Sequence, residues 1–314
     1  MNTLTEIANA AKKALPGSGT LSNIRSLLTA PDTVDRALDD WLNFIDEIGG
    51  IPKIPELTEK HPPTGKLKTL IRRGIPNRLR VEVWKRMAGY DRHFMPGYFD
   101  VMLEQHAHET TRATEDIEQD LPRTFPNHPL FQTPEGIGKL RNLLKVWAFH
   151  KPEVGYCQSM NFLAGILLIV GFTAEEGFYM FAHLMELIPN YYVDNLKEAD
   201  IEMHALDTLL KERLPRVHVL LHENMLETSH FALQVAIPSP PLPAHETFQG
   251  PTAIVPLADE TTLRIWDAIY AEGDKILFRV ALAIMKQAEG PPRPIPAPTS
   301  PLPCTVLRCL TTSG

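Results

Sequence analysis

The chain has 314 residues, 44% of them hydrophobic and 22% charged, so it can bury a substantial core in one large or two medium domains. Its formal net charge of -7, without a dense Lys/Arg run, argues against a protein that tracks nucleic acid. Three cysteines are too few for a disulfide framework or a four-ligand zinc site, and they indicate a reducing compartment.

The sequence also predicts a cytoplasmic protein without a transmembrane segment. Glu6, Asn9, Lys12 and Lys13 interrupt the amino terminus, which therefore lacks the apolar stretch of a signal peptide. The longest apolar run, Phe162 to Phe172, reaches only about half of the roughly 20 residues that a membrane-spanning helix requires. We interpret this run as a buried helix.

The first predicted element is an amphipathic helix from Val34 to Ile48, where apolar residues recur at helical spacing with Asp and Glu between them. The proline-containing stretch from Ile51 to Gly65 predicts a linker, because proline biases the preceding residue away from helix. We therefore place a boundary near Lys66, between an N-terminal extension and linker (1–65) and a main domain (66–289).

Helical patterns then succeed one another along the main domain, and no alternating strand pattern competes with them. In one of them, Leu140, Leu143, Leu144 and Trp147 share the face expected of a helix packed on a core. The predicted helices cover Leu79 to Met87, Gly138 to His150, Tyr156 to Val170, Thr173 to Met185, Ile201 to Leu214 and approximately Thr262 to Gln287. The predicted fold class is all-α.

Two proline-rich regions do not fit a helical domain. The segment from Val235 to Pro256 carries six prolines in 22 residues, a density that neither a helix nor a central strand accepts. It is predicted to be an irregular insertion. The last segment, 290–314, is also rich in proline and without periodicity, which predicts a disordered tail.

Arg123 is the first candidate site residue. Pro122 and Pro126 bracket it and exclude it from the interior of a regular helix, so it is predicted to project from a rigid loop. A guanidinium offered in this way suits a phosphoryl group, because its planar fork binds two oxygens and stays charged. Taken alone, the local sequence favours an ordinary surface arginine.

Gln158 is the second candidate, and the pattern from Tyr156 to Val170 predicts that it lies in the first turn of a helix. Unpaired N–H groups and the positive end of the helix dipole favour an anion at such a place. The glutamine amide can donate to phosphate and accept a hydrogen bond from an attacking water. A glutamine that caps or solvates the helix start is the alternative.

Other candidates are weaker. His218 and His222 stand four residues apart, as metal ligands on one helical face do, but no third ligand is apparent, so no metal site is predicted. Cys157 has no base partner and is expected to be an inert thiol. The segment Gly136 to Leu140 lacks the earlier glycine and the Ser/Thr of a phosphate-binding loop. GTP and Mg²⁺ are therefore expected to arrive with a partner, and no cofactor of the chain's own is predicted.

Four ordered blocks between Leu67 and Ala288 resemble the TBC domain of Rab GTPase-activating proteins. The blocks are Arg73-Gly74-Ile75-Pro76 followed by Leu79, Arg80, Val83 and Trp84; Ile117, Asp120, Arg123, Thr124 and Pro126; Tyr156, Gln158, Met160 and Asn161; and Leu263-Arg264-Ile265-Trp266-Asp267 followed by Glu272-Gly273.

The resemblance implies an all-helical domain that binds a Rab-family small GTPase in its GTP-bound state and completes the catalytic site from outside. Such a protein is an enzyme activator rather than an enzyme with its own substrate. It regulates vesicle trafficking, and its Rab partner recruits it to endomembranes.

The resemblance also assigns roles to individual residues. Arg123 matches the family's arginine finger and Gln158 its glutamine finger. Asp120 and Tyr156 are expected to hold the two finger loops. The remaining motif positions taken as supporting residues are Asn161, Arg73, Trp84 and Asp267.

The chain departs from the family pattern in three places. Ser159 stands where the family usually has glycine, the segment 235–256 replaces an aromatic-rich helix, and proline follows Ala288 where the domain usually continues. Two interpretations therefore stay open. One is a competent Rab activator, and the other is a non-catalytic or defective isoform that acts only as a Rab-binding or scaffold module.

Overall fold

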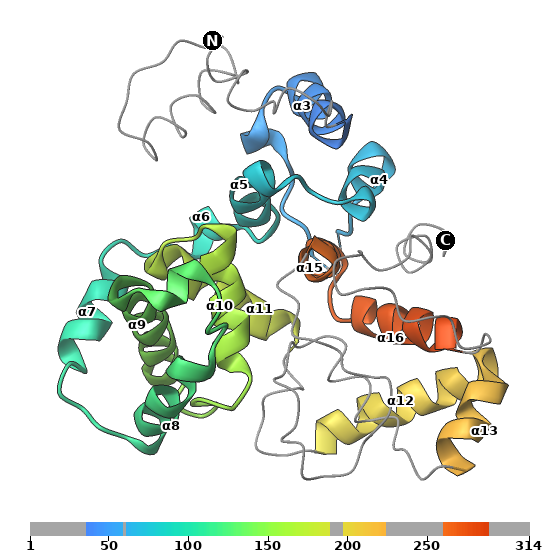
Figure 1. The fold of residues 1–314 in the computed structure, drawn as a ribbon. Coiled ribbons are helices and arrows are strands. Elements are labelled where there is room, and N and C mark those ends of the chain that lie inside the picture. Colours follow the sequence, from blue (N-terminus) through green and yellow to red (C-terminus); the bar gives the residue numbers. More distant parts are fainter. Residues whose placement is uncertain (1–35, 59–60, 189–196, 224–259, 289–314) are drawn as a thin grey trace.

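A computed structural model describes residues 36–58, 61–188, 197–223 and 260–288, and the regular secondary structure of these residues is helical throughout (Figure 1). The all-α class is therefore confirmed. The insertion expected at 235–256 and the tail expected at 290–314 lie outside the described residues. In the described part of the chain, no helix is long and apolar enough to cross a membrane.

The helices carry the labels of Figure 1. They are α3 (Arg36–Ile48), α4 (Gly65–Arg73), α5 (Asn77–Met87), α6 (Tyr90–His93), α7 (Tyr98–Gln105), α8 (Arg112–Asp120), α9 (Pro134–His150), α10 (Met160–Val170), α11 (Ala174–Leu187), α12 (Lys197–Arg213), α13 (Pro215–Glu223), α15 (Glu260–Glu272) and α16 (Lys275–Ala288), together with the 3-10 turns η1 (Ile51–Lys53), η2 (Leu121–Arg123) and η3 (Pro129–Gln132).

The centre of the fold is the mutually packed group α9, α10 and α11. Every residue of α10 from Met160 to Leu168 is buried, as expected for a helix that is apolar on all sides and surrounded by other helices. Thr133 caps the start of α9 by accepting a hydrogen bond from Gly136, and Thr173 forms a reciprocal capping box with Glu176 at the start of α11. The sequence thus encodes both where these helices begin and which faces they bury.

Helices α9 and α12 begin four residues before the predicted Gly138 and Ile201. Two further predicted boundaries were wrong, and backbone conformation explains both. Helix α10 begins at Met160 rather than Tyr156, because Gly155 and Ser159 have φ values of 60° and 86°, which a right-handed helix does not allow. The late helix is two helices, α15 and α16, because Gly273 between them has a φ of 81°. Helices α4, α6, α7, α8 and α13 were not predicted.

The amino-terminal helix shares the hydrophobic core of the main domain. Trp41 of α3 is 1% exposed and donates a hydrogen bond from Nε1 to the carbonyl oxygen of Gly74 at 3.0 Å. In the stretch predicted as a linker, Ile54 and Leu57 are buried in the same core cluster. The domain boundary near Lys66 stays a prediction.

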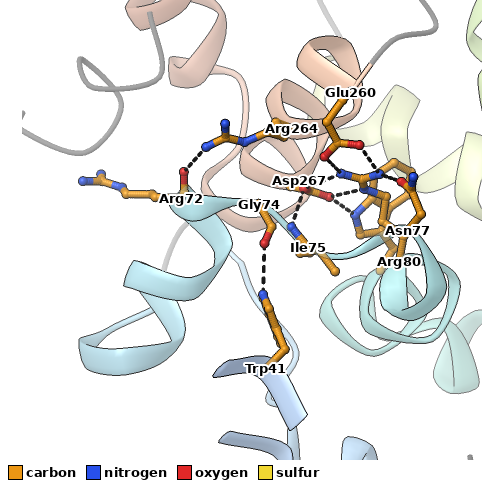
Figure 2. Close-up of polar contacts among 10 residues, drawn as sticks. Trp41, Arg72, Gly74, Ile75, Asn77, Arg80, Glu260, Arg264 and Asp267 are labelled. Atoms are coloured by element: carbon orange, nitrogen blue, oxygen red, sulfur yellow. Dashed lines mark hydrogen bonds and ion pairs between the residues drawn. The ribbon is translucent and has the colours of Figure 1, made fainter. Parts of the chain in front are cut away.

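The buried carboxylate of Asp267 joins α15 to α5 and to the short segment between α4 and α5 (Figure 2). It accepts hydrogen bonds from the Ile75 backbone N–H at 2.9 Å, from Arg80 Nε at 3.0 Å and from Trp84 Nε1 at 2.8 Å. Arg80, itself 0% exposed, also contacts Glu260 through its second edge at 2.8 Å. A buried charge of this kind is tolerated only because its lone pairs are satisfied.

Both members of the buried pair are charged at neutral pH. Burial raises the pKa of Asp267 to about 6, although Arg80 and the N–H donors oppose that shift. Burial also disfavours the Arg80 guanidinium, but Asp267 and Glu260 outweigh it, and the net pKa of Arg80 is raised. The ion pair therefore fastens α15 to α5 at physiological pH.

Asp267→Asn should destabilise the domain by about 3 kcal/mol or more, because it leaves the buried Arg80 charge without its buried carboxylate partner. The measurement is the free energy of unfolding in urea. Glu260→Gln is the matched control, since it removes the other carboxylate from the same guanidinium at a side chain that is 57% exposed. That change should cost about 1 kcal/mol or less. Equal losses in the two variants would contradict the role given to Asp267.

Candidate functional site

Arg123 ends a short 3-10 turn, where the sequence predicted a rigid loop outside a regular helix. Helix α8 finishes at Asp120, and η2 continues it from Leu121 to Arg123, with Pro122 in the first turn where its missing N–H is not needed. The Arg123 side chain is 46% exposed and pairs with the carboxylate of Asp120. The guanidinium is thus held at the surface by a nearly buried anion.

Gln158 lies in the turn before α10, not in the helix as predicted. Ser159 is the N-cap residue and has the left-handed φ of 86°. This conformation costs a non-glycine residue about 1–2 kcal/mol, and it explains why glycine suits the position. The turn directs Gln158 to an exposed place ahead of the first N–H groups of α10.

A shared carboxylate fastens the Arg123 turn to the Gln158 turn. Asp120 Oδ1 pairs with Arg123, and its Oδ2 accepts a hydrogen bond from the Tyr156 hydroxyl at 2.5 Å. Burial and the neighbouring Asp120 raise the pKa of Tyr156, so the hydroxyl stays protonated and able to donate. Asp120 and Tyr156 therefore connect the Arg123 turn to the segment that carries Gln158.

A second buried link runs between the same two segments. Asn161, 0% exposed on α10, donates from Nδ2 to Thr124 Oγ1 at 2.7 Å, and Thr124 Oγ1 donates to the Asp120 carbonyl oxygen at 2.8 Å. Because all three groups are buried, loss of either bond would leave an uncompensated polar group. The position of the Arg123 turn on α10 is thereby fixed.

Close packing completes the junction. Phe125 has a φ of 42°, and its ring lies edge-on to Phe162 with 5.4 Å between the ring centroids. A Cβ atom on Gly165 would lie 3.0 Å from the Phe125 ring and 3.2 Å from the Thr124 methyl group, so a larger residue here would push the turn away from α10. Sequence reasoning missed Gly165, although a glycine inside an apolar helix was the available signal.

Positive φ marks both turns. Among the described residues, Phe125 and Ser159 are the non-glycine residues with positive φ, and each lies within two residues of a candidate finger. A positive φ in a non-glycine residue persists where the surrounding structure enforces it, and such strain is frequent at functional sites. The strain therefore points to the same two turns as the exposed side chains do.

The other supporting residues lie away from these turns. Arg73 is exposed and pairs with Asp40 of α3 at 2.9 Å, whereas Trp84 and Asp267 are 0% exposed in the interior polar cluster. Their positions are those of structural residues. The glycine-containing segment from Gly136 to Leu140 lies inside α9 and forms ordinary helix, so it presents no phosphate-binding loop.

Comparison with known proteins bears on the family and the fold. Residues 77–238, just over half of the chain, match the model of the Rab-GTPase-TBC domain. TBC1 domain family member 2B of Homo sapiens is 31% identical over 239 residues, which cover 71% of this chain and 23% of that protein. Growth hormone-regulated TBC protein 1 of Xenopus tropicalis is 32% identical over 235 residues, which cover 72% and 64% respectively. The chain thus spans less than two thirds of these relatives.

Solved structures show the same fold. The flagellar RabGAP TBC domain of Chlamydomonas superposes with a TM-score of 0.61 at 28% identity, covering 81% of this chain and 79% of that one. The Ypt/Rab-GAP domain of Gyp1p superposes with a TM-score of 0.56 at 19% identity and supports the fold alone. From the family model, the relatives and the shared fold together, the chain belongs to the Rab-GTPase-TBC domain family.

Proposed function

We propose that this chain accelerates GTP hydrolysis by a Rab-family small GTPase in its GTP-bound state, with Arg123 and Gln158 supplied in trans. The observation that carries the proposal is the junction of the two turns. One buried carboxylate, Asp120, holds Arg123 directly and the Gln158 turn through Tyr156. A guanidinium and an amide are thereby offered together at the surface.

The chemistry assigns a separate task to each side chain. Water attacks the γ-phosphorus of GTP, the bond to the β-phosphate oxygen breaks, and GDP and inorganic phosphate result. The planar guanidinium of Arg123 neutralises charge that develops on the phosphoryl oxygens, an effect worth about 10³ to 10⁵ in rate for arginine fingers. The Gln158 amide oxygen orients the attacking water by accepting a hydrogen bond from it.

The ion pair with Asp120 keeps the Arg123 side chain oriented before a phosphoryl group binds. Asp120 is 5% exposed, so its pairing with a guanidinium that is 46% exposed keeps the arginine oriented without burying it. When a phosphoryl group replaces Asp120 as the arginine's partner, the Tyr156 hydroxyl still satisfies the carboxylate. Orientation before binding lowers the entropy that must be lost in the transition state.

The nucleotide and its Mg²⁺ enter with the partner, so the chain acts as an enzyme activator without a cofactor of its own. Rab inactivation in this way regulates vesicle trafficking, and the chain works in the cytoplasm and at endomembranes to which the partner recruits it. The specific experiment is GTP hydrolysis across a panel of Rab proteins with and without the chain. Binding of a GTP-loaded Rab without stimulation would instead support a non-catalytic binding module.

Arg123→Ala and Arg123→Lys should each lower the stimulated rate by about 10³-fold, because lysine offers a point charge where the transition state requires a planar fork. Single-turnover GTP hydrolysis measures this. Arg141→Lys is the matched control, since Arg141 is 41% exposed and also pairs with a carboxylate of α8, that of Glu118. Full activity in the Arg123→Lys variant would remove Arg123 from its role.

Gln158→Ala should lower the stimulated rate by at least about tenfold, because water then lacks its orienting acceptor. A Rab whose own catalytic glutamine is replaced by alanine should still respond to the native chain. Gln105→Ala, a change at an exposed glutamine of α7, is the control and should have no effect. If the altered Rab fails to respond, the glutamine comes from the Rab and only one finger is supplied from here.

Gly165→Ala should displace the Arg123 turn, because the added methyl would lie 3.0 Å from the Phe125 ring. We expect the stimulated rate to fall about tenfold, with Rab affinity little changed. Gly138→Ala is the matched control, since nothing lies within 4 Å of a Cβ there, and alanine should add about 1 kcal/mol of stability in the helix. Undiminished stimulation by Gly165→Ala would show that the turn tolerates movement.

A further inference from the structure

Helices α12 and α13 form a hairpin with its own small core, separate from the turns that carry Arg123 and Gln158. The helices meet at Leu214, and Pro215 opens α13 in the position that proline prefers. The hairpin packs on α16 (Figure 1). This second core contains Leu206, Leu210, Leu214, Val217, Leu221, Ala281 and Met285.

Three metal-ligating side chains gather beside this core. His218 and His222 lie one turn apart on α13, each next in sequence to a buried residue of the hairpin seam. Asp207 faces them from α12, with Oδ2 at 3.3 Å from His218 Nε2 and Oδ1 at 3.6 Å from His222 Nε2. The third ligand that the sequence did not reveal is therefore supplied by the neighbouring helix.

We propose that Asp207, His218 and His222 form a binding site for a divalent transition-metal ion, with Zn²⁺ the best match. Ligand atoms about 2.1 Å from a tetrahedral zinc ion lie about 3.4 Å from one another. Asp207 presents a different oxygen to each imidazole, at 3.3 Å and 3.6 Å, and one candidate ligand atom from each of the three residues lies within 4.8 Å of the others.

The donor set determines which ion is bound. Two imidazoles and one carboxylate suit zinc and related transition metals, whereas Mg²⁺ and Ca²⁺ prefer oxygen ligands alone. A simple ion pair would occupy one imidazole, but here a second imidazole contacts the other oxygen of the same carboxylate. His222 is 63% exposed, so water reaches the fourth coordination position.

The site would clamp the hairpin rather than act on GTP. Its ligands come from two helices that otherwise meet through the small apolar core, so a bound ion adds a cross-link between α12 and α13. An ion that binds the folded chain stabilises it in proportion to the logarithm of its free concentration. The proposal is independent of the finger mechanism, which uses α8, η2 and the turn before α10.

The test is titration of the full chain with ZnCl₂ by isothermal calorimetry, and with MgCl₂ in parallel. His222→Gln removes one ligand at an exposed position. The matched control is His204→Gln, which changes an exposed histidine of α12 that is not in the cluster. Thermal melts without metal check that both variants fold like the native chain.

We expect one Zn²⁺ per chain, no saturable Mg²⁺ binding, and at least a tenfold loss of Zn²⁺ affinity in His222→Gln but not in His204→Gln. Substitution with Co²⁺ should give the visible absorption of a four-coordinate ion in the native chain and lose it in His222→Gln. Absence of saturable Zn²⁺ binding, or equal affinity in the native chain and His222→Gln, would overturn the proposal.

Discussion

Three residues of one short segment converge on a single carboxylate almost two hundred positions later in the chain. Ile75, Arg80 and Trp84 donate to Asp267, which is 0% exposed. These hydrogen bonds join α15, late in the chain, to a segment near its beginning. A buried ion pair adds little net stability over an apolar replacement, but breaking one member is costly. Its value here is geometric, since the donors fix how α15 lies against α4 and α5.

A nearly buried carboxylate also joins the turn that carries Arg123 to the turn that carries Gln158. Asp120 is nearly buried and binds Arg123 and Tyr156 with its two oxygens, while Asn161 and Thr124 connect the same segments beneath it. A carboxylate with two partners sets the relative positions of two short turns that lie far apart in the sequence. This is the kind of supporting shell that a catalytic geometry needs, because misplacement by about 1 Å can cost about a hundredfold in rate.

The sequence revealed the fold class because periodicity is visible without coordinates. The stripe of α9 and the apolar run of α10 identified the central helices, and the ordered motifs identified the family. Helix α8 was missed because Ile117 is its one buried apolar residue, too little to make a stripe. The start of α10 was missed because a serine does not itself indicate a positive φ, although the glycine usual in the family at position 159 was the available signal. Asp207 could not be paired with His218 until the hairpin placed them together.

The central claim is that Arg123 and Gln158 stabilise the transition state of GTP hydrolysis rather than only contacting the GTPase in its ground state. The most direct measurement is the affinity of the chain for a GDP-loaded Rab with and without aluminium fluoride, which mimics the transferred phosphoryl group. Groups that stabilise a transition state bind its analogue at least about a hundredfold more tightly than the ground state. The native chain should therefore bind tightly only when the analogue is present, and Arg123→Ala should lose that gain. Equal affinity with and without the analogue would contradict the claim.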